Sequence, residues 1–217
     1  CVGTGIGVNS KKTTRYTKKL FNRVLSHEYI HSVRDEKTKK YLEEMGFKAW
    51  NTGCPTLWGL TSDFCAKIPT TKSDSVVFTL TSYEPDREND QLMIDILKNN
   101  YKKIYFWPQS LGDAEYIKSF SGYDCIEIIA PNLKAYDEIL KTNIDYVGNR
   151  LHGGIFAMQH QCRAIIISID YRAKEMSETY SFSCIQREKI QEELEKKINS
   201  NWSTEIKGLD FEQIAKW

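Results

Sequence analysis

Long hydrophobic runs are missing from this 217-residue chain, and no stretch is apolar enough to cross a bilayer. No signal peptide is recognisable. Net charge is also small, because 30 lysines and arginines against 29 aspartates and glutamates leave +1. So weak a field recruits neither nucleic acid nor an acidic membrane. These absences predict a cytoplasmic protein without a membrane span and without a nucleic-acid partner.

Paired cysteine motifs are missing too. None of the six cysteines forms a C-x-x-C motif, and Cys125 and Cys162 lie beside strand-like runs. At this length we expect reduced, mostly buried thiols rather than a disulfide framework. Reduced thiols without disulfides are typical of a cytosolic protein.

From residue 75 onward, short apolar runs alternate with segments of helical period. Helices of about 10 residues between buried strands imply right-handed crossovers and a parallel sheet. The sequence therefore predicts an α/β fold with a Rossmann-like parallel sheet. The charged segment 185–198 is predicted to be a surface helix. The expected strands are 76–80, 104–107, 126–129, 144–147 and 164–169.

The beginning of the chain shows a shorter pattern of the same kind, and a segment rich in glycine and proline without a period follows it. We predict a first Rossmann-like lobe at 1–55, a linker at 56–74, and a second lobe with C-terminal helices at 75–217. The chain starts at Cys1, directly before the glycine-bearing run 2–7, which reads as the end of a strand.

The run His27-Glu28-Tyr29-Ile30-His31 matches the H-E-x-x-H zinc motif. That motif binds zinc only when a helix brings both histidines to one face. Here Tyr29, Ile30 and Val33 favour a strand, in which the histidines would lie about 13 Å apart. They could not share a zinc ion, so we predict no metal site.

Residues 144–170 read as strand, glycine-bearing turn, helix and strand, which is one βαβ unit. Arg150 and His152 fall where the first strand ends and the helix begins, followed by Gly153 and Gly154. Ligands of parallel sheets bind at that edge, and a helix N-terminus attracts anions there. The pattern therefore predicts an anion site. The alternative is a surface ion pair for Arg150 and a turn cap for His152.

Arg34 is predicted at a second strand-to-helix junction, with Ser32 or Asp35 as the helix cap. A ligand with two anionic groups would use both arginines. The alternative is an ion pair with Asp35 or Glu36. Further polar residues follow other predicted strands, and ordinary loop capping is the alternative for the first two of them. They are Ser82, Gln109, Asp170 and Arg172.

Three stretches resemble the polysaccharide pyruvyl transferase family. The run Asp145-Tyr-Val-Gly-Asn-Arg-Leu-His-Gly-Gly-Ile-Phe-Ala is similar to the family signature. Residues 32–46 resemble its arginine-bearing strand-to-helix turn, and residues 165–172 resemble its final strand, which ends in aspartate and a basic residue. Their order and spacing also fit. Members usually carry a further N-terminal half, so we expect a fragment with an incomplete first lobe.

The resemblance implies a two-lobed, glycosyltransferase-B-like transferase without a metal or cofactor. It would move pyruvate as a ketal from phosphoenolpyruvate onto a sugar residue of a bacterial-type surface polysaccharide or its precursor. The acceptor would be a glycan or a lipid-linked oligosaccharide, met in the cytoplasm or at the inner face of the membrane with the assembly machinery. The oligomeric state stays open.

The resemblance also implies which residues act. Arginine forks suit the phosphate and carboxylate of the donor, and histidine transfers protons near neutral pH. Arg150 and His152 would be catalytic. Glycines would let backbone N–H groups approach the phosphate. The implied donor-binding residues are Arg34, Arg150, Leu151, His152, Gly153 and Gly154. Asp170, Arg172, Gln109 and Ser82 rank below them.

One residue departs from the family pattern, since Cys54 stands where members often carry an acidic residue before Pro55. Two other functions remain open. A nucleotide-sugar-dependent glycosyltransferase would also place a diphosphate at a helix N-terminus, with Asp170 on the ribose. A non-catalytic polysaccharide-assembly module could keep the fold and the anion site.

Overall fold

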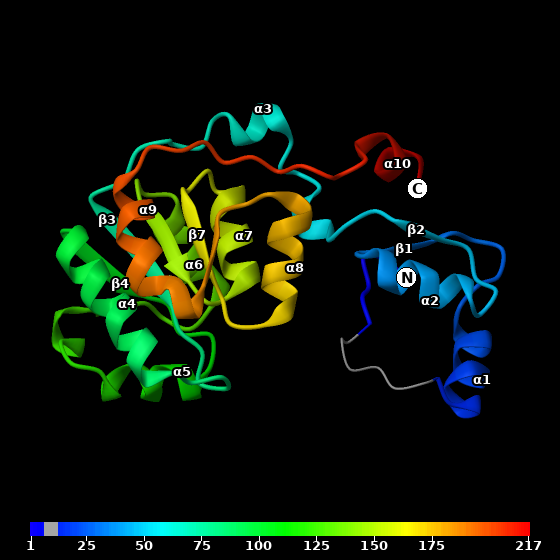
Figure 1. Cartoon of the computed structure of the whole chain (residues 1–217), viewed down its shortest axis with the longest axis horizontal. Coiled ribbons are helices and arrows are strands. Elements are labelled where there is room, and N and C mark those ends of the chain that lie inside the picture. The colour runs from blue at the N-terminus through cyan, green and yellow to red at the C-terminus, as the bar shows by residue number, and fades with distance from the viewer. Residues whose placement is uncertain (7–12) are drawn as a thin grey trace. The chain divides into compact units, whose positions relative to one another are not determined.

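The computed structural model describes residues 1–6 and 13–217, so Gly7 of the glycine-bearing run lies outside the described residues. The chain forms two compact units, which we describe separately (Figure 1). Unit 1 comprises Cys1–Gly59 and Gly208–Trp217, and unit 2 comprises Leu60–Lys207.

Unit 1 is built around two short parallel strands, β1 and β2. Its small core consists of Val33, Leu42, Phe47 and Ala49. Helix α2 begins at the cap Asp35, whose carboxylate accepts from the Thr38 N–H at 2.7 Å. The elements are α1 Arg15–Val24, β1 His31–Val33, α2 Glu36–Glu43, β2 Ala49–Asn51, η1 Pro55–Leu57 and α10 Phe211–Lys216.

The C-terminal segment belongs to unit 1 because Trp217 packs there. Its indole N–H donates to the Ile30 carbonyl at 2.7 Å. The ring also meets Trp58 edge-on, with centroids 6.1 Å apart. The last residue of the chain therefore packs against residues just before β1 and after β2.

Unit 2 holds a six-stranded sheet in the order β5-β4-β3-β6-β7-β8, and every pair is parallel. Numbered within the unit, this is the order 3-2-1-4-5-6 of the doubly wound Rossmann fold. The predicted α/β class is confirmed. The elements are α3 Ser62–Cys65, β3 Ser75–Thr79, α4 Arg87–Asn100, β4 Lys103–Phe106, α5 Leu111–Tyr116, η2 Ile117–Ser119, η3 Tyr123–Cys125, β5 Glu127–Ile128, α6 Leu133–Leu140, β6 Asp145–Gly148, α7 Leu151–Gln159, β7 Ala164–Ser168, α8 Tyr171–Tyr180, β8 Cys184–Gln186, η4 Arg187–Lys189, η5 Ile190–Leu194 and α9 Glu195–Asn199.

The sixth strand, β8, corrects the prediction of one helix over 185–198. Ile185 pairs with β7 and is buried, so the helical turns begin only after it. Ile190, Leu194 and Ile198 then repeat every four residues and are fully buried against the sheet and α4. The charges that suggested a surface helix cover only its outer side.

Helices cover both faces of the sheet in unit 2 (Figure 1). Helices α4 and α9 lie together over one face, where Phe78 and Leu97 belong to the large core. Helices α7 and α8 pack on β6, β7 and β8. No helix in the described ranges is long and apolar enough to span a bilayer.

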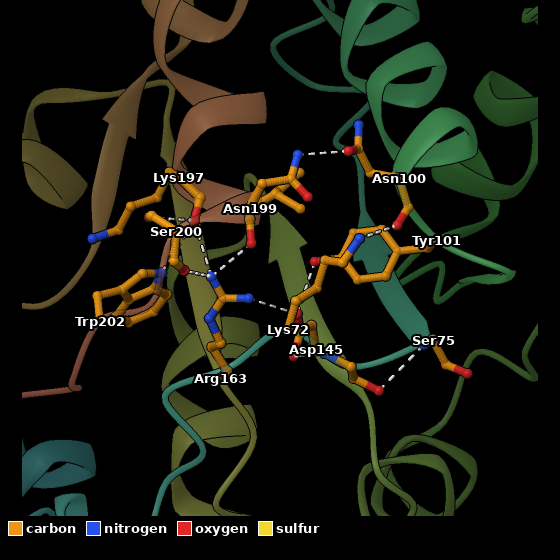
Figure 2. Close-up of polar contacts among 12 residues, drawn as sticks. Lys72, Ser75, Asn100, Tyr101, Asp145, Arg163, Lys197, Asn199, Ser200 and Trp202 are labelled. Atoms are coloured by element: carbon orange, nitrogen blue, oxygen red, sulfur yellow. Dashed lines mark hydrogen bonds and ion pairs between the residues drawn. The ribbon is translucent and has the colours of Figure 1, made fainter.

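Arg163 ties the end of α9 to the amino edge of the sheet (Figure 2). Its side chain is 1% exposed, and Nη1 lies 3.1 Å from an Asp145 carboxylate oxygen. Nη2 donates to the carbonyls of Lys197, Ile198 and Ser200 at 2.8–2.9 Å. The guanidinium thereby satisfies carbonyls at the end of α9, and the Ser200 hydroxyl and the Trp202 indole N–H also donate to the Lys197 carbonyl.

Candidate functional site

The sheet of unit 2 reverses its winding direction between β3 and β6, because β4 lies on one side of β3 and β6 on the other. In doubly wound folds, ligands bind beyond the carboxyl ends of the strands at this point. A pocket of about 120 Å³ lies there. Seven predicted site residues line it: Gln109, Arg150, Leu151, His152, Gly153, Asp170 and Arg172.

Arg150 follows β6 and is held on several sides. Its Nη2 donates to a carboxylate oxygen of Asp113 at 2.6 Å. The guanidinium lies over the ring of Tyr83, 5.0 Å from the centroid. Its side chain is 17% exposed, whereas its partner Asp113 is fully buried. The pair is therefore not the exposed surface ion pair that sequence alone left open.

Asp113 organises this edge of the sheet. One carboxylate oxygen accepts from the N–H and the hydroxyl of Ser82, at 2.9 and 3.1 Å. The other accepts from the Gln109 N–H at 3.2 Å and from Arg150. Burial alone would raise the pKa of this carboxyl, but the hydrogen bonds from Ser82 and Arg150 outweigh it and lower the pKa. Asp113 is thus ionised at neutral pH.

Sequence reasoning missed Asp113. The available signal was Ser110-x-x-Asp113, a pattern of helix starts, and the Ser110 hydroxyl does accept from the Asp113 N–H at 3.1 Å. That pattern predicts that the Asp113 carboxylate accepts a hydrogen bond from the N–H of its own cap residue, Ser110. Instead the carboxylate reaches two other strand ends, which only the tertiary fold brings close.

Helix α7 begins at Leu151, close to the predicted junction at Arg150 and His152, and Gly153 and Gly154 lie inside its first turn. The Gly154 N–H donates to the Arg150 carbonyl at 3.0 Å within the helix. A Cβ at Gly154 would lie 2.6 Å from Ile166 and 2.9 Å from Tyr146. This glycine therefore brings α7 close to the sheet.

No side chain caps α7, in contrast to the other helices of eight or more residues that the structure describes. Those helices have the caps Thr14, Asp35, Asp86, Asn132 and Asp170. The first-turn residues Leu151, His152 and Gly153 line the pocket, so the positive end of α7 lies at the pocket.

Buried tyrosines support this first turn. The Tyr146 hydroxyl donates to the Arg150 carbonyl at 2.9 Å. Because its proton is used there, the Thr79 hydroxyl donates to Tyr146, at 2.7 Å, and accepts from the Arg150 N–H, at 3.3 Å. The Tyr136 hydroxyl donates to the Gly153 carbonyl at 2.9 Å.

The remaining pocket residues differ in role. His152 is exposed in the first turn of α7. Asp170 caps α8 through the Ala173 N–H at 2.9 Å and pairs with Arg172 at 3.0 Å. Asn149 is 5% exposed, and neither atom of its carboxamide has a hydrogen-bond partner in the described part of the chain.

Arg34 belongs to unit 1. Its Nε lies 3.7 Å from a carboxylate oxygen of Asp35. The backbone N–H of Arg34 donates to the Thr4 carbonyl at 3.0 Å. Asp35, rather than Ser32, caps the helix that follows. A shared ligand for Arg34 and Arg150 stays a prediction.

The two histidines of the H-E-x-x-H run lie in different environments. Strand β1 begins only at His31, so the prediction of a strand already formed at Tyr29 is wrong. The ring of His27 stacks on Phe47 with centroids 4.5 Å apart, and one ring nitrogen lies 3.0 Å from Asn22. The ring nitrogens of His31 lie 2.9 Å from the N-terminal amine and the Ser26 carbonyl. Across residues 1–6 and 13–217, no three metal-ligating side chains form a cluster.

A family model described as polysaccharide pyruvyl transferase matches residues 1–171. The chain belongs to this family. Comparison with curated proteins and with solved structures gave no match. The match to the pyruvyl transferase family includes Arg34, Arg150 and His152, whereas Arg172 and the segment from β8 to α10 follow it.

Proposed function

We propose that the chain transfers pyruvate from phosphoenolpyruvate onto two hydroxyls of one sugar residue, in a surface polysaccharide or its lipid-linked precursor. Family membership supports pyruvyl transfer to a polysaccharide. The observation that supports an anionic donor is the meeting of Arg150 with the uncapped start of α7 at the switch point of the sheet.

Phosphoenolpyruvate carries a phosphate and a carboxylate, and this site suits one compact anion. The first-turn N–H groups of α7 and the guanidinium of Arg150 would bind the phosphate. Arg172 also lines the pocket, where it pairs with Asp170. The role of Arg34 as a second donor arginine rests on the family resemblance.

The reaction needs one proton at the donor methylene. Protonation turns the methylene into a methyl group and makes the adjacent carbon electrophilic, and a sugar hydroxyl adds there. The bond from that carbon to the phosphate oxygen breaks, and the second hydroxyl closes the ketal. The two hydroxyl protons balance the methyl proton and the hydrogen phosphate that leaves. His152, exposed at the pocket, is the proposed proton donor.

The test is turnover of phosphoenolpyruvate labelled with carbon-13 at its methylene, with a panel of glycosides and lipid-linked oligosaccharides as acceptors. We expect a labelled ketal methyl signal and one phosphate released per ketal. His152→Ala should slow the reaction at least about 100-fold, the usual range for loss of a proton donor. His160→Ala is the matched control, because His160 lies at the other end of α7 and binds Asp137.

A different result would overturn the proposal. If no acceptor gains a ketal while a nucleotide sugar donates its glycosyl group, the chain is a glycosyltransferase. Equal rates for His152→Ala and wild type would remove His152 from the reaction.

A further inference from the structure

We infer that Asp113 is the positioning residue of the donor site. It holds the guanidinium of Arg150 in one orientation, so that the guanidinium is already aligned when an anion binds. The inference deepens the proposed function, and it rests on that function for phosphoenolpyruvate as the anion. Asp113 itself lies beneath the site, with a fully buried side chain.

The carboxylate joins three strand ends. Ser82 follows β3, Gln109 follows β4 and Arg150 follows β6, and all three donate to Asp113. Each carboxylate oxygen receives two hydrogen bonds, which leaves it little freedom to turn. Ser82 and Gln109 were predicted at strand ends as possible ligand contacts, with loop capping as the alternative. Their N–H groups and the Ser82 hydroxyl fix the carboxylate, and Gln109 also lines the pocket, so a ligand contact stays a prediction.

Arg150 is fixed from further directions as well. The ring of Tyr83 lies against one face of the guanidinium, and Thr79 and Tyr146 hold the backbone N–H and carbonyl of Arg150. A long side chain that is free in solution loses rotamer entropy when it binds an anion. Asp113 and Tyr83 remove that cost in advance, so the donor meets a pre-oriented cation.

The hydrogen bonds to Asp113 leave donors of Arg150 available to a ligand. Three of the four hydrogen bonds to the carboxylate come from Ser82 and Gln109, so they are independent of the guanidinium. Arg150 uses Nη2 on Asp113, and a guanidinium has further N–H groups for an anion.

The experiment is a double-mutant cycle on the 217-residue chain. Calorimetry measures the Kd of phosphoenolpyruvate and of inorganic phosphate for wild type, Asp113→Asn, Arg150→Lys and the double variant. Asp113→Asn keeps the shape but replaces one acceptor oxygen with an amide. We expect it to raise both Kd values about 10- to 100-fold, the range for losing a charged hydrogen bond. In the Arg150→Lys background, Asp113→Asn should change each Kd by less than about 2-fold.

Asp137→Asn is the control, because Asp137 pairs with Lys141 and His160 outside the pocket. It should leave Kd unchanged in both backgrounds. A purely structural role would show Asp113→Asn lowering the melting temperature with Kd intact, or an equal loss in both backgrounds. Either result overturns the inference, and so does a wild-type chain that binds neither probe.

The two probes separate this inference from the proposed function. Coupling that appears with phosphate, in a chain that forms no ketal, supports the role of Asp113 and rejects pyruvyl transfer. Ketal formation with no coupling between Asp113 and Arg150 supports pyruvyl transfer and rejects the role of Asp113.

Discussion

Arg150 Nη2 lies 2.6 Å from Asp113 Oδ2, and this contact joins the end of β6 to the first turn of α5. Breaking a buried pair from one side leaves the other charge uncompensated, which costs about 3–5 kcal/mol. The pair therefore contributes to folding as well as to the site, and the predictions below separate the two contributions.

Acid should weaken the fold through Asp113. Its pKa is lower in the folded chain than the unfolded value of about 3.9, so the folded state binds the proton less tightly. The stabilisation is present above the unfolded pKa and is lost as pH falls through the folded pKa. Urea unfolding should thus show a stability gap between wild type and Asp113→Asn that is constant near pH 6 and narrows below about pH 4. A gap independent of pH would contradict this.

Gly154→Ala should lower the free energy of unfolding by about 1–3 kcal/mol, because the new Cβ would meet Ile166 and Tyr146 in a packed interface. The gain in helix propensity, about 1 kcal/mol, offsets only part of that loss. Gly59→Ala is the control, since a Cβ there meets no atom within 4 Å. Denaturant unfolding measures both variants, and an unchanged or stabilised Gly154→Ala would refute the packing argument.

Arg163→Met should destabilise the protein by about 3–5 kcal/mol, because it leaves Asp145 buried without its cation and exposes the final carbonyls of α9. Adding Asp145→Asn should recover part of the loss. Lys102→Ala removes an exposed pair with Asp74 and should cost less than about 1 kcal/mol. Thermal unfolding reports all three, and equal effects for Arg163→Met and Lys102→Ala would show that the buried network contributes little.

Asn149→Leu should stabilise the protein by about 1 kcal/mol, since it replaces a buried carboxamide without hydrogen-bond partners among the described residues by an apolar side chain of similar size. Chemical denaturation provides the measurement, with Asn99→Leu on the exposed side of α4 as a control. A lower stability for Asn149→Leu would mean that the carboxamide already makes compensating interactions.

Periodicity was enough to predict the parallel sheet, because apolar strands and helical segments alternate from β3 to β7. It failed at β8, where only three residues pair and the charges that follow are typical of a helix. Arg150 and His152 could be predicted because strand, turn and helix are adjacent in sequence. Asp113 could not, since its partners Ser82 and Arg150 are 31 and 37 positions away and no local pattern connects them.

The most direct test of the account is a calorimetric titration of the chain with phosphoenolpyruvate, with a uridine-diphosphate sugar in parallel. Arg150→Ala and Lys102→Ala each remove one positive charge, the first at the pocket and the second at the amino edge of the sheet. The account predicts that wild type and Lys102→Ala bind phosphoenolpyruvate alike and that Arg150→Ala binds at least about 10-fold more weakly. Tighter binding of the nucleotide sugar, or equal phosphoenolpyruvate affinity in Arg150→Ala, would contradict it.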